Sequence, residues 1–220
     1  MTIYVGIDDT DNLQSRGTGH LVRTLAEELR AAGLGTPLSV TRHQLLVHPD
    51  IPYTSHNSSA CVTMRSEAGP EAVAAAAGRF LRERAASGSD PGLCVAEAGK
   101  VAEAVVRFGQ SAKARVLTTD EAHRTAGEAG LHLSGHGGTN GGVIGALAAV
   151  GLRHSGGDGR FLWLRGIREM TGVHTTAEIL AQSGVERFLN VGEDGKPALV
   201  TPSMSASGSV RSSSTVWRPC

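Results

Sequence analysis

The sequence predicts a fold that combines helices and strands, either α/β or α+β, built on mixed sheets. Short apolar runs that are typical of strands alternate along the chain with segments of helical periodicity. Breaks rich in glycine and proline separate these segments. The chain has 220 residues, of which 40% are hydrophobic, so it can bury a core as one large domain or two closely packed small ones.

Strand and helix patterns follow one another through the first half of the chain. The expected elements are a strand from Ile3, a helix over 21–29 that ends near Gly33, strands over 38–47 and 60–64, a helix from Pro70 to about residue 86, and a strand over 93–96. The irregular segment 48–59 holds two prolines and many polar side chains, which identifies it as a candidate site loop.

Capping signals mark two helices of the second half. Thr118 with Glu121 and Thr175 with Glu178 have the spacing of capping boxes. A small apolar helix over 143–150 and a strand over 161–164 lie between them. We expect one folded region over residues 1–200 and a flexible serine-rich tail over 201–220.

Charge and cysteine content limit the classes of function. Basic and acidic side chains number 21 each, so a nucleic-acid contact would depend on a local patch. The three cysteines include no CxxC pair, which argues against a disulfide framework and a structural zinc site. No apolar run reaches membrane-spanning length, and no leader pattern is present. These features favour a soluble protein of the cytoplasm, without membrane partners.

Three carboxylates stand at the end of the first strand pattern. Asp8, Asp9 and Asp11 would meet at a sheet edge, where open folds place ligands. Like charges this close repel one another, and a hard divalent cation such as Mg²⁺ would relieve the repulsion. An Asx-turn with a helix N-cap at Asp11 or Asn12 is the structural alternative. A second chemical alternative is a phosphatase loop similar to that of haloacid dehalogenase-like enzymes, in which Asp9 attacks phosphorus and Asp11 is the acid/base.

A glycine-rich loop over 133–142 leads into the small-residue helix. Glycines allow backbone N–H groups to approach an anion, and the helix N-terminus adds partial positive charge. The loop matches neither the P-loop nor the dinucleotide fingerprint, and a flexible hairpin or close helix packing would also explain it. Together with the acidic turn it suggests a clamp for a nucleoside triphosphate. Arg16 is a candidate to neutralise the phosphate, and His20 and His136 are weaker candidates to contact it.

Three ordered blocks together resemble the N-terminal part of the archaeal tRNA agmatinylcytidine synthetases, which attach agmatine to the wobble cytidine of a minor isoleucine tRNA. The blocks are 5–11 around the acidic turn, 48–53 with Asn57 shortly after, and 138–151 around the glycine loop. The resemblance spans roughly residues 3–170. It implies an α+β fold with a mixed-sheet, kinase-like domain and ferredoxin-like elements, which uses ATP and Mg²⁺.

Site roles follow from the resemblance position by position. The implied metal ligands are Asp8, Asp9 and Asp11, and the implied catalytic residues are Asp8, Asp9 and Thr18, the last at the place of a threonine that becomes phosphorylated. The implied nucleotide contacts are Arg16, Gly17, Gly138, Asn140, Gly141 and Gly142.

The resemblance therefore predicts a Mg-ATP-dependent phosphotransferase or ligase that activates an acceptor oxygen by phosphorylation. We expect the chain to lack the zinc-ribbon and OB-fold modules that help that family to hold tRNA, because it has no zinc-ribbon cysteines and no room for the OB-fold. The expected acceptor is therefore either a tRNA base or a small metabolite. A homodimer or a separate recognition subunit would supply the recognition that these modules provide. A non-catalytic ATP-binding subunit and the Asp9 phosphatase are the alternatives.

Overall fold

The computed structural model describes residues 1–51, 57–167, 169–185, 189–191 and 197–199. The chain forms two compact units, residues 1–163 and residues 164–220. The sequence-based boundary at residue 200 and the serine-rich tail over 201–220 lie outside the described residues and stay predictions.

The first unit contains nearly all of the regular structure. Its elements are β1 (Thr2–Asp8), α1 (Thr18–Ala31), β2 (Thr36–Gln44), β3 (Ser58–Arg65), α2 (Gly69–Arg84), β4 (Gly92–Glu97), the 3-10 helix η1 (Ala98–Lys100), α3 (Glu103–Ser111), α4 (Thr119–Glu128), β5 (His132–Gly135), α5 (Gly142–Ser155) and β6 (Arg160–Leu164), whose last residue begins the second unit. The predicted alternation of strand and helix is therefore observed. The short elements η1, α3 and β5 are not among the elements predicted from the sequence.

The strands form one sheet in the order β5-β4-β1-β3-β2-β6. The ladders β1–β3, β1–β4, β2–β3 and β4–β5 are all antiparallel. The order of β1 to β4 and their two crossover helices is that of the ferredoxin-like split βαβ motif. The α+β class with ferredoxin-like elements is thus confirmed, and the parallel pairings of a mixed sheet do not occur in these four ladders.

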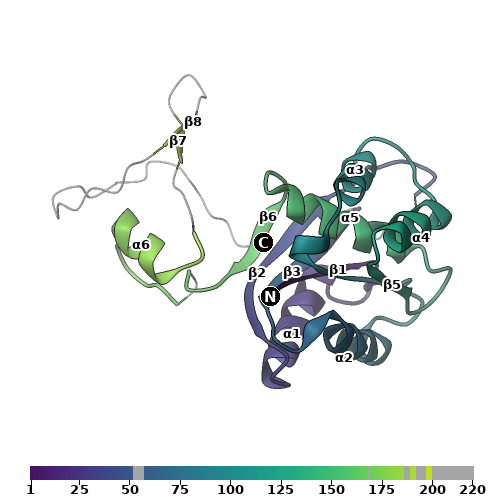
Figure 1. Cartoon of the computed structure of the whole chain (residues 1–220), viewed down its shortest axis with the longest axis horizontal. Coiled ribbons are helices and arrows are strands. Elements are labelled where there is room, and N and C mark those ends of the chain that lie inside the picture. Colours follow the sequence, from purple (N-terminus) through teal and green to yellow (C-terminus); the bar gives the residue numbers. More distant parts are fainter. Residues whose placement is uncertain (52–56, 168, 186–188, 192–196, 200–220) are drawn as a thin grey trace. The chain divides into compact units, whose positions relative to one another are not determined.

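Helices cover both faces of this sheet, as Figure 1 shows, with α1 and α2 on one side and α3, α4 and α5 on the other. The core under α1 and α2 contains Ile3, Val5 and Ile7, the odd-numbered residues of β1. The core under α5 contains Cys94 and Ala96, which alternate with the Val95 of the first core. Period-two alternation along each strand therefore supplies one hydrophobic layer to each face.

The helix α5 approaches the backbone of the sheet very closely at the glycines of β1 and β4. A Cβ atom on Gly6 would lie 2.1 Å from the carbonyl oxygen of Ala146, and one on Gly92 would lie 2.1 Å from the carbonyl carbon of Gly142. Since real Cβ atoms do not approach backbone this closely, glycine is required at both strand positions. The small residues of α5 predicted from the sequence thus serve close helix packing.

The predicted capping boxes are both present. The Thr118 hydroxyl accepts from the Glu121 amide and the Glu121 carboxylate accepts from the Thr118 amide, and Thr175 and Glu178 do the same for α6 (Thr176–Gln182). The second unit also contains the short antiparallel pair β7 (Leu189–Val191) and β8 (Pro197–Leu199). Within the part of the chain that the structure describes, no helix has the length and apolar content to cross a membrane.

The close packing of α5 predicts that Gly6→Ala destabilises the fold. The added methyl group cannot avoid a backbone oxygen, so we expect a loss of about 1 to 3 kcal/mol in the free energy of unfolding, measured in denaturant. Gly127→Ala is the matched control, because this exposed position of α4 has no atom within 4 Å of the added methyl group. Alanine should add about 0.5 to 1 kcal/mol there. Equal stability of Gly6→Ala and the wild type would contradict this description of the helix–sheet contact.

Candidate active site at one edge of the sheet

The antiparallel topology brings the acidic turn and the glycine loop to one edge of the sheet. Strand β1 ends at this edge, and its neighbour β4 begins there. Strand β5 is antiparallel to β4, so it also ends there and delivers the glycine loop to the same place. The backbone N–H of Gly142 donates to the Asp90 carbonyl at 3.1 Å, and the Asp90 N–H donates to the Asp9 carbonyl at 3.1 Å. The two predicted motifs are therefore tied together through Asp90.

Asp8 lies directly against the first turn of α5. A Cβ atom on Gly145 would lie 1.7 Å from the Asp8 carboxylate oxygen Oδ2, so only glycine leaves room for this carboxylate. Burial, followed by repulsion from Asp9 and Asp11, raises the Asp8 pKa to about 7, although a backbone hydrogen bond from Asp9 acts in the opposite direction. The site therefore holds a carboxyl group that takes up a proton near neutral pH when no cation neutralises it.

Asp9 occupies the strained position of the turn. Its φ angle is 51°, in the left-handed region that is uncommon for residues other than glycine, asparagine and aspartate. Burial raises its pKa to about 6, and the charges of Asp90 and Asp11 act in the same direction. The acidic side chains of Asp8, Asp9 and Asp11 thus lie close to one another in the turn. A fourth acidic side chain, that of Asp90, joins them from a segment more than seventy residues away in the sequence.

Asp90 holds the glycine loop in place. Its carboxylate accepts from the backbone N–H of Asn140 at 2.6 Å, from that of Gly141 at 3.1 Å and from the hydroxyl of Thr139. Gly138, at φ 57°, and Gly141 leave room for this carboxylate, since Cβ atoms on them would lie 2.6 Å and 3.2 Å from its oxygens. In this structure the loop amides before α5 donate to a carboxylate of the protein itself, and phosphate binding by these amides stays a prediction.

Asp90 is not among the predicted site residues, because its segment, 88–92, has only the glycine and proline pattern of a turn between a helix and a strand. Asp90 stands three residues before the predicted strand over 93–96, which is a signal that can be read from the sequence. Its importance depends on the pairing of β4 with β1, which the sequence does not reveal.

Thr18, at the start of α1, forms a hydrogen-bonded group with the acidic turn. Its hydroxyl donates to Asp11 Oδ1 at 2.8 Å and accepts from the hydroxyl and the N–H of Thr10 at 3.1 Å and 3.4 Å. Both threonines are buried, with 9% and 3% of their surface exposed. This hydroxyl therefore has a fixed orientation toward a carboxylate, which is the arrangement of a nucleophile next to a general base.

The other predicted residues lie around this group. A Cβ atom on Gly17 would be 3.8 Å from Asp11 Oδ2, so this glycine borders the cluster. Arg16, one position before it, and His20, in the first turn of α1, are both exposed. The structure therefore places these two side chains in contact with solvent beside the acidic turn.

The four carboxylates do not form a ready-made metal cage. Within the described ranges, no group of three or more histidine, cysteine, aspartate or glutamate side chains is placed to hold a metal ion. The donor set still fits a hard divalent cation, because it consists of carboxylate, hydroxyl and carbonyl oxygens with excess negative charge. The raised pKa values of Asp8 and Asp9 show the electrostatic cost that such a cation would remove.

Comparison with known proteins gives a partial match. No protein-family profile matches the chain. The isoleucine-tRNA 2-agmatinylcytidine synthetase TiaS of Pyrococcus horikoshii is 30% identical over 162 residues, which cover 69% of this chain and 36% of that protein.

The chain is a partial relative of TiaS.

Solved structures give the same result. A tRNA fluorescent labeling enzyme is 28% identical with a TM-score of 0.61, and the match covers 69% of this chain and 36% of that one. The complex of TiaS with its isoleucine tRNA and ATP is 28% identical with a TM-score of 0.59 and the same coverage. The complex of TiaS with this tRNA, AMPCPP and agmatine is 27% identical, also with a TM-score of 0.59, over 68% of this chain and 36% of that one. The chain thus spans about a third of the length of these TiaS proteins.

The second block of the resemblance, 48–53 with Asn57, starts from the same sheet edge. Strand β2 runs antiparallel to β3, as β1 does, so the segment that follows β2 leaves from the edge where β1 ends. The Asn57 side chain donates to the Leu46 carbonyl at 2.6 Å and fixes the far end of this loop. Residues 52–56 of the loop lie outside the described residues.

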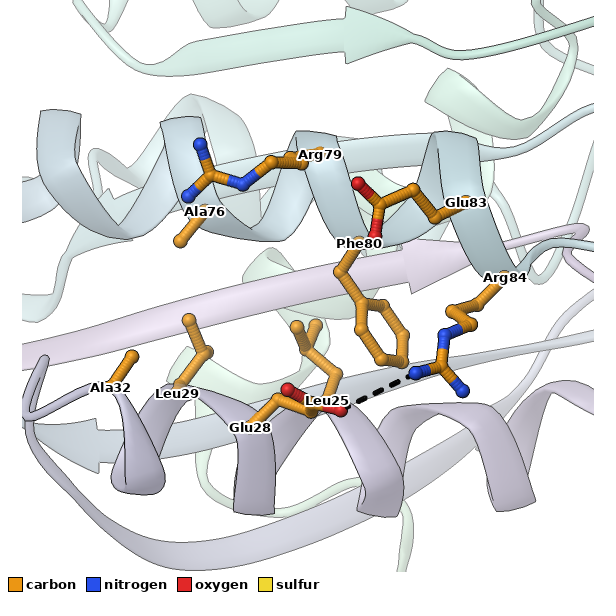
Figure 2. Close-up of a pocket in the computed structure, with 9 residues that line it drawn as sticks. All are labelled: Leu25, Glu28, Leu29, Ala32, Ala76, Arg79, Phe80, Glu83 and Arg84. Carbon is orange, nitrogen blue, oxygen red and sulfur yellow. Dashed lines mark ion pairs between the residues drawn. The ribbon is translucent and has the colours of Figure 1, made fainter.

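Outside this edge, the small cleft between α1 and α2 is shown in Figure 2. It has a volume of about 130 Å³ and contains the apolar side chains of Leu25 and Phe80 below an ion pair between Arg84 and Glu28 at 3.7 Å. This volume is below the roughly 300 Å³ of the smallest typical ligand sites. We therefore assign it no ligand.

The buried carboxyl group of Asp8 predicts a specific dependence of stability on pH in metal-free buffer. The folded state holds a proton on Asp8 up to a pKa of about 7, while the ordinary pKa of an aspartate is 3.8, so wild-type stability from this group falls as the pH rises through that window. Asp8→Asn removes this loss. We expect the free energy of unfolding of Asp8→Asn relative to wild type to increase between about pH 5 and pH 8. Titrating groups that do not interact with Asp8 cancel in this difference, and a constant or decreasing difference would contradict burial as the cause.

Proposed function

We propose that the chain is a Mg-ATP-dependent phosphotransferase or ligase that activates an acceptor oxygen by phosphorylation. The observation that carries the proposal is the meeting of the acidic turn, Thr18 and the glycine loop at one sheet edge. The partial relationship to TiaS, whose solved complexes contain ATP or AMPCPP, supports the choice of nucleotide.

Asp8, Asp9 and Asp11 are the proposed ligands of Mg²⁺. When bound, the ion would neutralise phosphate oxygens and reduce the repulsion among the three carboxylates. Arg16 and Gly17 follow Asp11 in the chain, and the exposed Arg16 side chain is accessible to a phosphate from the solvent side. Charge repulsion among the carboxylates is unfavourable when no ion is bound, and a bound ion would neutralise it. Such a site suits reversible binding of a metal-nucleotide complex.

Asp90 is the proposed competitor of the nucleotide at the glycine loop. Its carboxylate accepts from the amides of Asn140 and Gly141, which are the donors that the sequence assigns to a phosphate. We infer that a triphosphate exchanges with this carboxylate, while Gly138, Gly141 and Gly142 keep the approach open. The carboxylate thus keeps the loop amides hydrogen-bonded before the nucleotide arrives.

Thr18 is the proposed acceptor of a phosphoryl group. Asp11 takes the hydroxyl proton, the Thr18 oxygen forms the new bond to phosphorus, and the bond from phosphorus to the ADP leaving oxygen breaks. The hydrogen bond of 2.8 Å already points the proton at Asp11. Asp8 and Asp9 serve the same step by holding the metal ion.

Beyond Thr18, the proposed acceptor substrate of the whole reaction is a tRNA base or a small metabolite. The reaction would take place in the cytoplasm, where ATP is available. Two of the matching TiaS complexes contain an isoleucine tRNA, whereas this chain matches only about a third of the length of those proteins. A homodimer or a separate recognition subunit would complete tRNA binding. A phosphatase with Asp9 as its nucleophile stays the alternative.

Binding of Mg-ATP tests the site. Asp8→Asn and Asp9→Asn should each weaken Mg-ATP binding by about tenfold or more, since each removes a charged ligand of the metal; calorimetric titration with ATP and Mg²⁺ measures this. Asp120→Asn, an equal charge change on the exposed surface of α4, is the control and should bind as wild type does. Unchanged binding in both site variants would refute the site. Tight binding without turnover in the presence of acceptors would support the non-catalytic subunit instead.

Phosphorylation of Thr18 is a separate test. After incubation with Mg-ATP, mass spectrometry should find one phosphoryl group on the peptide that contains Thr18 in the wild type and in Thr18→Ser. Thr18→Val should carry none, because it keeps the shape and lacks the oxygen. Thr24→Val, on the same helix with its hydroxyl bonded to the His20 carbonyl, is the control and should still be modified. Equal modification of Thr18→Val would exclude this acceptor.

A further inference from the structure

A second concave site lies between α2 and the β4–β5 end of the sheet. This groove has a volume of about 560 Å³, within the range of small-molecule sites. Its polar lining comes from Arg79 and Arg82 of α2, Lys100 of η1, His132 and Ser134 of β5, and His136. We call it the histidine groove.

The three polar residues from β5 and the position after it form a hydrogen-bonded chain with α2. The Arg82 guanidinium lies 3.3 Å from His136 Nδ1, His136 Nε2 lies 3.0 Å from the Ser134 hydroxyl, and that hydroxyl lies 2.9 Å from His132 Nε2. Period-two alternation explains why positions 132, 134 and 136 face the same side.

The arginine determines the direction of this chain. A guanidinium group can only donate, so His136 Nδ1 accepts and its Nε2–H donates to Ser134. The Ser134 hydroxyl then donates to His132 Nε2, which leaves the Nδ1–H of a neutral His132 without an acceptor in the chain. Burial lowers the pKa of both histidines, in agreement with neutral rings. The series of hydrogen bonds thus has the N–H donor of His132 at one end and the remaining guanidinium donors of Arg82 at the other.

A glycine in the middle of α2 makes room for this arrangement. A Cβ atom on Gly78 would lie 2.8 Å from His136 Cε1 and 3.4 Å from an Arg82 guanidinium nitrogen. Glycine inside a helix costs about 0.5 to 1 kcal/mol relative to alanine. The unfavourable residue is therefore placed where the histidine ring and the guanidinium meet.

Charge and surface chemistry indicate the type of ligand. Three cationic side chains line the groove against two carboxylates, Glu71 and Glu97, and Glu97 already pairs with Lys100 at 3.0 Å. In the described part of the chain, Arg79 and Arg82 have no carboxylate partner. The remaining lining includes Ala74, Ala75 and Leu131, which suit the organic part of a ligand.

We propose that the histidine groove binds a small phosphate ester, with its phosphate oxygens on Arg82 and His132 and its organic part over the apolar floor. Phosphate offers several acceptor oxygens to a lining that consists mainly of donors. The groove is far larger than a free phosphate ion, which is why an ester is expected. This site is separate from the acidic turn and does not depend on the proposed Mg-ATP site.

Ribose 5-phosphate in metal-free buffer is the probe. Calorimetric titration should show saturable binding, and ¹⁵N resonances of the His132 and His136 rings should shift along the same curve. Arg82→Gln should weaken binding about tenfold or more, since it removes a charge-assisted hydrogen bond. Gly78→Ala should weaken it as well, because its methyl group displaces the His136 ring while alanine favours the helix.

Matched variants separate this site from its surroundings. Arg84→Gln removes the same charge from the same helix, but Arg84 faces Glu28 across the α1–α2 cleft, as Figure 2 shows, so the affinity should change less than about twofold. Asp8→Asn should bind ribose 5-phosphate as wild type does, even where it no longer binds Mg-ATP.

Four outcomes would overturn the proposal. They are no binding at millimolar probe, equal weakening by Arg82→Gln and Arg84→Gln, equal affinity for ribose without its phosphate, and binding of a short single-stranded RNA through Arg82 without binding of the sugar phosphate. The last result would make the groove a nucleic-acid contact.

Discussion

The backbone contact between α5 and the sheet is the constraint on which the site depends. Gly6 and Gly92 in the strands, with Gly142 and Gly145 in the helix, bring main chain against main chain and against the Asp8 carboxylate. Because no larger residue fits, the first turn of α5 is held directly over the ends of β1 and β4. The glycine loop and the acidic turn therefore have one relative position, set by packing and not by a flexible hinge.

This contact also explains the electrostatics of the site. The helix covers part of Asp8 and shields it from water, and the turn brings Asp9 close to Asp11 and Asp90. Burial and mutual repulsion therefore both raise the pKa values, while the amides of the glycine loop, which hold Asp90, offset part of the negative charge. Such a site reduces the stability of the empty protein, as binding sites for cations commonly do.

The match to TiaS covers 69% of this chain and about a third of those proteins. The histidine groove lies on the opposite side of the sheet from α5, between α2 and β5, and uses different side chains. The same fold thus presents one surface that is rich in carboxylates and another that is rich in hydrogen-bond donors, so the two can bind ligands of opposite charge.

Local chemistry determined much of this protein from its sequence alone: the alternation of strands and helices, both capping boxes, the acidic turn and the anion-binding character of the glycine loop. These follow from residue spacing, glycine geometry and the repulsion of neighbouring charges. Only the tertiary structure decided that the sheet pairs β4 with β1, that Asp90 occupies the loop amides, and that Thr18 donates to Asp11. Strand order depends on contacts between residues distant in the chain, which one sequence without its fold does not encode in any local pattern.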